Sequence, residues 1–178
     1  MKKTILSIIL SVMTFAAIAQ ENTIKFLGIP IDGTKKEMIS KLQAKGYEYD
    51  PSSDALYGEF NGNNVIILVQ TVNNRVWRIV VADAEVTDEA NIKIRFNRLF
   101  EQLSNNGKYD VAKGNILGEK ENIFYEMIGH KKRYDATFTL KDKSVNGIVW
   151  FTIARESNEY AIAMYYENLD NQANGDDL

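Results

Sequence analysis

The stretch NGNNVIILVQTVNNRVWRIVVA, residues 61–82, decides the fold class of this chain. The Asn-Gly pair at 61–62 is typical of a tight hairpin turn, and the run Val65–Val69 that follows is rich in β-branched residues. Asn73-Asn74 turns the chain again, and Val76–Ala82 then shows an alternating strand pattern. Connections this short can join only antiparallel neighbours. The stretch therefore predicts two strands of an antiparallel meander.

Further strands are predicted on both sides of this stretch. Residues 47–49 and 56–60 precede it, with turn-forming residues between them at 50–54. Alternating or continuous apolar residues after it predict strands over 134–140, 148–154 and 160–166.

Two helices are predicted from their caps and their periodicity. Thr34 and Glu37 match a capping box, and Gly46 supplies a C-terminal stop, which places the first helix over residues 34–45. Thr87 is expected to cap a second helix that ends near Gly107. The apolar faces of the two helices comprise Met38, Leu42, Ile92, Phe96, Leu99 and Leu103.

Together these elements predict the α+β class: an antiparallel sheet with both amphipathic helices packed on one face. Each half of the chain has a helix followed by a meander, but Thr34 and Thr87 are 53 positions apart whereas Val65 and Ile148 are 83 apart. Two interpretations stay open: a duplicated helix-plus-meander unit with an insertion at 108–132, or the ordinary alternation of α+β proteins. Within the insertion, residues 123–127 are predicted as a strand.

The N-terminus has the pattern of an export signal. A basic start with Lys2 and Lys3, an apolar run from Ile5 to Ala17 and an A-x-A end at Ala19 predict a cleaved signal peptide over residues 1–19. The apolar run is shorter than the roughly 20 residues of a membrane span. We expect a single domain over 20–167, a disordered acidic tail over 168–178 and a periplasmic or secreted location.

Composition argues against a nucleic-acid partner, disulfides and a lipid anchor. Cleavage of the signal takes the formal net charge from −3 to −5, which argues against a nucleic-acid partner. The chain has no cysteine, so neither disulfides nor a diacylglycerol anchor is expected, and no stable membrane anchor after cleavage.

No motif predicts a catalytic, cofactor-binding or metal-ligating residue. Gly28–Lys35 resembles a phosphate-binding loop, but Thr34 and Lys35 stand in the reverse order, so a turn before a capped helix is favoured. His130 is the only histidine and is expected in a solvated loop. The acidic residues Asp83, Glu85, Asp88 and Glu89 are explained at least in part by the helix dipole.

Aromatic residues on the predicted strands are the only candidates for a binding site. Alternation places Tyr165 and Tyr166 on opposite faces of the last strand, and antiparallel sheets often leave one face open. We predict Trp77, Trp150, Tyr165 and Tyr166 as ligand-face candidates; their alternative role as strand formers and core filler stays open.

The stretch Phe26–Gly33, the helix ending at Lys45-Gly46-Tyr47, and Leu56–Gly62 resemble a group of small exported proteins of Bacteroides-type gut bacteria. That resemblance implies export and no site residues. The order of elements is also similar to the β-lactamase inhibitor protein architecture, which implies an antiparallel sheet backed by helices; a shared fold does not give a function.

Three hypotheses of function follow from the sequence. The leading one is an exported, non-catalytic binding module for an envelope or extracellular protein or a glycan, without a cofactor. The alternatives are an extracytoplasmic hydrolase that uses dispersed carboxylates and a self-associating structural component of the envelope.

Overall fold

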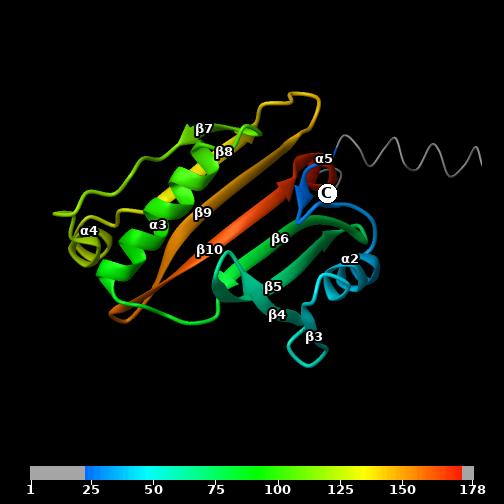
Figure 1. Cartoon of the computed structure of the whole chain (residues 1–178), viewed down its shortest axis with the longest axis horizontal. Coiled ribbons are helices and arrows are strands. Elements are labelled where there is room, and N and C mark those ends of the chain that lie inside the picture. Colours follow the sequence, from blue (N-terminus) through cyan, green and yellow to red (C-terminus); the bar gives the residue numbers. More distant parts are fainter. Residues whose placement is uncertain (1–22, 174–178) are drawn as a thin grey trace, which may run out of the picture.

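The computed structural model describes residues 23–173, and its central feature is one eight-stranded antiparallel sheet (Figure 1). The spatial order is β3-β4-β5-β6-β10-β9-β8-β7, so β6 and β10 pair in the middle. The strands are β3 (Glu48–Asp50), β4 (Ala55–Phe60), β5 (Asn63–Val72), β6 (Arg75–Asp83), β7 (Tyr109–Lys113), β8 (Asp135–Leu140), β9 (Gly147–Glu156) and β10 (Glu159–Asn168). The predicted α+β class and antiparallel sheet are confirmed. The predicted signal peptide, 1–19, lies outside the described residues.

The remaining elements are a small hairpin and four helices. β1 (Lys25–Phe26) pairs with β2 (Ile29–Pro30), and the helices are α2 (Lys35–Gln43), α3 (Glu89–Ser104), α4 (Ile123–Gly129) and α5 (Leu169–Ala173). The sequence predicts only α2 and α3. None of the helices within residues 23–173 is long and apolar enough to cross a membrane.

The caps of the two predicted helices turn out differently. Thr34 and Glu37 form the expected capping box at the start of α2. The prediction that Thr87 caps α3 is wrong: the backbone of Thr87 bridges to Tyr160, and the next residue, Asp88, accepts the hydrogen bond from Asn91 N at 2.8 Å. The Thr87 carbonyl accepts from Tyr160 N at 2.8 Å, so the first carbonyl of the helix is that of Asp88, which accepts from Ile92 N at 3.0 Å, and the cap moves on by one position.

Two other segments differ from their predictions. Residues 123–127 belong to the helix α4 and not to a strand, because Asn122 caps the segment and Glu126 O accepts the backbone hydrogen bond of His130. At the C-terminal end, Asn168 closes β10 and Leu169–Ala173 forms α5. The first residues of the predicted disordered tail are therefore part of the fold, and 174–178 lie outside the described residues.

The core lies on one face of the sheet, where the cross-strand partners are uniformly buried. One row runs through Ile67, Val81, Met164, Phe151 and Ala136, and the next through Val69, Ile79, Tyr166, Val149 and Phe138. α3 packs on this face through Phe96, whose ring centroid is 4.9 Å from that of Phe151, and Phe100, 5.6 Å from Phe138. Met38 and Leu42 of α2 are fully buried in the same core.

Buried polar side chains join the first segment of the described chain, before α2, to its last segment, at the end of β10 and in α5. Asn168 donates to Ile31 O at 2.9 Å, and Asn171 of α5 donates to Val76 O at 2.7 Å and to Asp32 at 3.1 Å. Arg75 completes the cluster with a bidentate contact to the Asp32 carboxylate, at 2.9 and 3.0 Å. Buried amides need such partners, so α5 is fixed to the segment before α2.

Asp32 provides a test of this cluster by pH. Burial alone would raise the pKa of Asp32, but hydrogen bonds from Gly33, Asn171 and Arg75 outweigh it and hold the pKa below its ordinary value. The ionised Asp32 carboxylate therefore stabilises the folded state at neutral pH, and this stabilisation is lost as the pH falls through the folded-state pKa of Asp32. We predict that Asp32→Asn lowers the free energy of unfolding at pH 7 by about 1–2 kcal/mol.

Urea unfolding at pH 7, 5 and 3 measures this effect, and the deficit of Asp32→Asn should shrink toward pH 3. The exposed Asp110→Asn is the matched control and should change little at any pH. A deficit of equal size at all three pH values would show that the amide disturbs packing and not charge.

Candidate binding surfaces

The face of the sheet opposite the core carries a cluster that we call the open-face ladder: Trp77, Arg78, Trp150, Tyr165 and Glu167. Strand register places these residues together, because Arg78 lies opposite Glu167, and Tyr165 lies opposite Trp150. Trp77 joins them at an irregularity between β5 and β6, where Gln70 pairs with Arg78 and Thr71 with Val76. The extra residue lets neighbours in sequence lie on one side of the strand.

The ladder is a stack of one cation and three rings. The Arg78 guanidinium carbon lies 3.9 Å from the ring centroid of Trp77 and 5.5 Å from that of Tyr165. Tyr165 in turn stacks on Trp150, with ring centroids 3.8 Å apart and an interplanar angle of 7°. Cation–π and stacking contacts of this kind each add to stability beyond burial.

Glu167 ties Trp150, at one end of this stack, to Arg78 inside it. Its Oε1 atom accepts from Trp150 Nε1 at 2.7 Å and forms an ion pair with Arg78 Nη2 at 2.8 Å. Glu167 is 4% exposed, whereas the four other members are half-buried. The carboxylate is thus covered by the side chains that bind it, and the other four side chains keep partial exposure.

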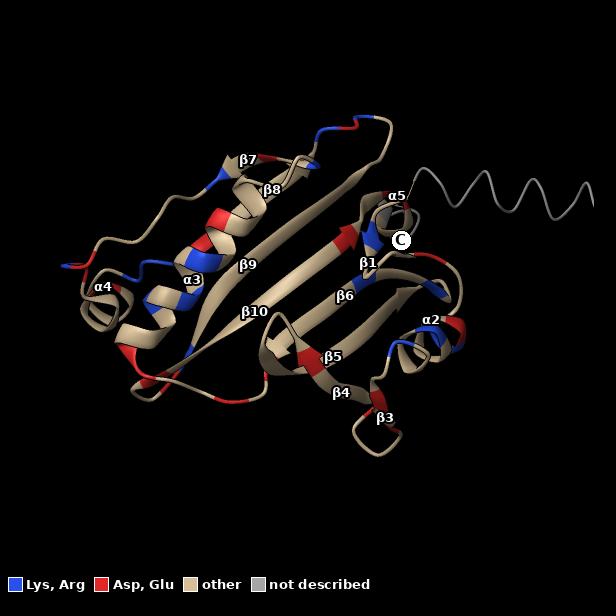
Figure 2. Ribbon diagram, viewed as in Figure 1, with Lys and Arg blue, Asp and Glu red and all other residues tan. Residues whose placement is uncertain are grey.

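The centre of the open face has little free charge. The middle strands β5, β6, β9 and β10 are mostly uncharged, and charged residues gather on the helices, turns and loops (Figure 2). In the ladder, the only two charges neutralise each other. Aromatic residues and arginine with few free charges are the composition of the core of a protein interface.

Three of the four predicted ligand-face aromatics lie in the ladder, and Tyr166 does not. Tyr166 lies opposite Ile79 and Val149 in the core, 7% exposed, with its ring centroid 5.0 Å from that of Phe26. Strand alternation separates it from Tyr165. The sequence could not predict that Arg78 and Glu167 belong to this cluster, because they come together only through the pairing of β6 with β10.

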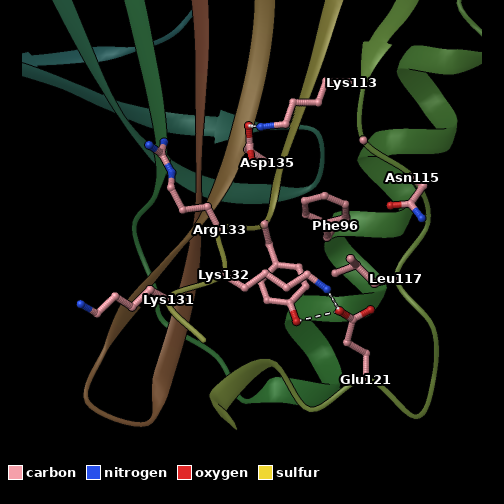
Figure 3. Close-up of a pocket in the computed structure, with 11 residues that line it drawn as sticks. Phe96, Lys113, Asn115, Leu117, Glu121, Lys131, Lys132, Arg133 and Asp135 are labelled. Carbon is pink, nitrogen blue, oxygen red and sulfur yellow. Dashed lines mark hydrogen bonds and ion pairs between the residues drawn. The ribbon is translucent and has the colours of Figure 1, made fainter. Parts of the chain in front are cut away.

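A second candidate surface is a cavity of about 700 Å³ beside the start of β8, formed by the insertion between β7 and β8 (Figure 3). The pairing of β7 with β8 ends at Lys113 and Thr137, and the chain then leaves the sheet at Gly114. Gly114 has φ +104°, and a Cβ atom there would lie 2.8 Å from the Cβ of Ala136. Only glycine fits this departure, which opens the cavity.

A row of polar side chains on α3 fixes the outer wall of the cavity. Asn97 donates to Leu117 O at 3.0 Å and accepts from Leu117 N at 2.7 Å. Lys93 donates to Glu119 O at 3.3 Å, and Glu89 accepts from the first amides of α4, with Ile123 N at 2.9 Å. These three residues are spaced by four along α3 and so form one stripe along the helix.

The cavity combines an apolar floor with charged walls. Phe96, Leu117 and Tyr134 are almost fully buried. Tyr134 donates to Glu121 at 2.8 Å, and Lys132 forms an ion pair with the same carboxylate. The Lys132 hydrogen bond holds the pKa of Glu121 below its ordinary value, while burial, reinforced by Glu121, raises the pKa of Tyr134. Glu121 is therefore ionised and Tyr134 neutral at pH 7.

The other residues singled out in the sequence have structural roles. His130 lies in an exposed position beside Glu126, with 3.0 Å between Nδ1 and Oε2. In the acidic group, Asp83 pairs with Arg95, Glu85 accepts from Asn64 and Asp88 caps α3. Gly28–Lys35 forms the turn before the capped helix α2. Within residues 23–173, no three His, Asp or Glu side chains gather as a metal site would require.

Comparisons with protein-family models, with curated proteins and with solved structures find no match to this chain.

Asn97 allows a direct test of how the cavity wall is held. We predict that Asn97→Ala lowers the free energy of unfolding by about 1–2 kcal/mol, because it removes two hydrogen bonds and leaves the Leu117 backbone without its partners. Amide hydrogen exchange should become at least about tenfold faster at Leu117 and its neighbours, but not in the sheet. Gln43→Ala, an exposed amide on α2, is the control. Unchanged exchange at Leu117 would mean that the wall is held by other contacts.

Proposed function

We propose that this chain is an exported, non-catalytic binding module that takes a protein partner on the open face of its sheet. The open-face ladder is the observation that carries this proposal. Trp, Tyr and Arg are the residues in which the binding energy of protein interfaces concentrates. Here they are held in fixed positions by one another and by Glu167, so little side-chain entropy remains to be lost on binding.

The availability of this face depends on where the helices lie. We place α2 on the same side as α3, because Met38 and Leu42 are buried in the one core that also contains Ile67 and Phe96. Both helices would then back the core face and leave the ladder uncovered.

The strand order favours a duplicated helix-plus-meander unit. Strands β3–β6 form one meander and β7–β10 a second, and the two are joined by the pairing of β6 with β10.

The stacking geometry favours a protein over a glycan. Sugars bind aromatic side chains by lying flat on a free ring face. In the ladder, Tyr165 has Trp150 against one face and Arg78 near the other, and Trp77 has Arg78 over it. Outer faces remain only at the ends of the stack, on Trp77 and Trp150. What is offered along its length is ring edges and a cation, which suit the mixed surface of a protein.

Export is supported by the sequence pattern at the N-terminus. A cysteine-free chain that relies on packing and on ion pairs is compatible with an oxidising compartment, because no thiol can mispair there.

The alternative of a carboxylate hydrolase receives no support from the titratable groups. A catalytic acid needs a raised pKa, and among residues 23–173 every carboxyl group with a shifted pKa is shifted downward: Asp32, Glu37, Asp50, Asp54, Glu89, Glu121 and Asp142.

Affinity capture with the mature domain tests the proposal. Envelope proteins of the producing cell are captured on immobilised wild type, identified, and measured again as purified pairs. We predict that Trp77→Ala raises the dissociation constant by about thirtyfold or more, as truncation of a central interface residue does. Tyr125→Ala is the matched control, because Tyr125 is 58% exposed but lies on α4, away from the ladder.

Equal affinity of wild type and Trp77→Ala for the partner would contradict the assignment of this face. Sedimentation of the domain alone distinguishes a second outcome: dimers that Trp77→Ala dissolves would make the partner another copy of this chain.

A further inference from the structure

The outer side of α4 is apolar although it lies at the surface of the domain. The inner side holds this short helix in place, with Ile123 fully buried and Met127 packed against the core. The outer side presents Phe124, Tyr125 and Ile128, which are 41%, 58% and 50% exposed. Side chains three or four positions apart are neighbours on a helix, so these three form one surface, which we call the α4 patch.

The α4 patch belongs to a wider concentration of exposed apolar side chains. Among residues 23–173, eight large apolar side chains are exposed, and five of them lie between positions 111 and 128, namely Val111, Ile116, Phe124, Tyr125 and Ile128. Single apolar residues scattered over a surface need no explanation, whereas a patch of them marks an interaction site. Figure 1 places α4 at one end of the long axis of the domain, so a partner can approach the patch from outside the sheet.

Cations without carboxylate partners lie at both ends of the α4 patch. The guanidinium carbon of Arg155, near the end of β9, is 5.6 Å from the ring centroid of Phe124. At the other end, the ring of Tyr125 contacts that of His130, with centroids 5.1 Å apart, and the exposed Lys131 follows directly. Neither Arg155 nor Lys131 has an ion-pair partner among residues 23–173. The apolar surface is thus bordered by free positive charge.

The insertion that contains α4 also differs in charge from the rest of the chain. Residues 108–133 contain six Lys and Arg side chains against four Asp and Glu, whereas the whole chain has 21 against 24. Three of these acids have a basic partner: Asp110 lies near Lys143, Glu121 near Lys132 and Glu126 near His130. Of the charges in this segment, those outside the ion pairs of the described chain belong to Glu119 and to four cations, Lys108, Lys120, Lys131 and Arg133.

We propose that the α4 patch and the cations around it dock this domain reversibly on the surface of a lipid bilayer with anionic headgroups. Phe124, Tyr125 and Ile128 enter the interfacial region, while Arg155 and Lys131 lie at the level of the lipid phosphates. Aromatic and aliphatic side chains bordered by lysine and arginine are the composition of elements that bind in the plane of a membrane interface.

The charges favour a lipid surface over a protein as the occupant of this end of the domain. The free cations are spread over the insertion and the end of β9, and a protein partner would need an acid placed opposite each of them. A layer of anionic headgroups satisfies all of them wherever they lie on this end. Because the chain as a whole is acidic, its basic end is also the end that such a surface attracts.

Sedimentation of the mature chain with vesicles measures this binding. The probes are vesicles of phosphatidylcholine alone and vesicles of equal parts phosphatidylcholine and phosphatidylglycerol. We expect the anionic vesicles to bind at least about tenfold more tightly than the neutral ones, and added salt to weaken their binding by screening. In backbone NMR, spin-labelled lipid should broaden the amide signals of Phe124, Tyr125 and Ile128 and leave those of α2 unchanged.

A pair of double variants tests the apolar part of the surface. Phe124→Ser with Ile128→Ser should weaken binding to the anionic vesicles at least about tenfold, because both side chains then lose their contact with the interface. Tyr57→Ser with Ile94→Ser is the matched control, since these side chains are also exposed but lie outside the insertion, and it should leave binding unchanged.

A second pair tests the charges and stays informative if the serine variants fold poorly. Arg155→Gln with Lys131→Gln should weaken binding to the anionic vesicles at least about tenfold and leave binding to the neutral ones unchanged. Lys36→Gln with Lys45→Gln, the same change of charge at exposed positions on and just after α2, should alter neither.

The proposal is overturned if neutral vesicles bind as tightly as anionic ones, if the chain binds neither, or if the control pairs weaken binding as much as the test pairs. Broadened amides that lie outside the insertion and the end of β9 would also contradict it. Because the open-face ladder takes no part, these outcomes are separate from those of the partner-capture experiment.

Discussion

The antiparallel pairing of β6 with β10 is the contact on which the rest of the structure depends. It joins the two four-stranded halves, with Ala82 opposite Ala163 and Arg78 opposite Glu167. Side chains alternate between faces along a strand, so a slip of one residue would bring Tyr166 out of the core and bury Tyr165. The Asp83 carboxylate strengthens this register, because it accepts from Ile162 N at 3.0 Å and pairs with Arg95 of α3. One buried carboxylate thus ties both central strands to the long helix.

The register has opposite consequences on the two faces of the sheet. On the core face it aligns rows of aliphatic and aromatic side chains beneath α3. On the other face it brings two tryptophans, a tyrosine, an arginine and a glutamate from distant parts of the chain into the open-face ladder. The insertion between β7 and β8 adds a second surface, which depends on α3 more than on the sheet. The polar stripe Glu89, Lys93 and Asn97 holds it there, so α3 packs the core with one side and builds the cavity wall with another.

The sequence predicts those parts of the fold that depend on local chemistry. The capping box at Thr34, the Asn-Gly turn at 61–62 and the alternation of β10 are each set by neighbouring residues, and each is confirmed. The features that failed depend on distant contacts. Thr87 pairs with Tyr160, and α4 is capped in part by Glu89, more than 30 positions away. The same limit applies to the site: three of its aromatics could be predicted from strand composition, but Arg78, Glu167 and the cavity required the pairing of strands.

Cross-linking of β6 to β10 tests the central register most directly, because the chain has no cysteine of its own to interfere. Facing residues of antiparallel strands have Cα atoms about 4.5–5.5 Å apart, within the range of a disulfide, whereas diagonal neighbours lie about 7–8 Å apart. The register predicts that Ala82→Cys with Ala163→Cys forms an intramolecular disulfide under mild oxidation and that Ala82→Cys with Ala161→Cys does not. Formation of the second disulfide in preference to the first would contradict the register, and with it the placement of the ladder.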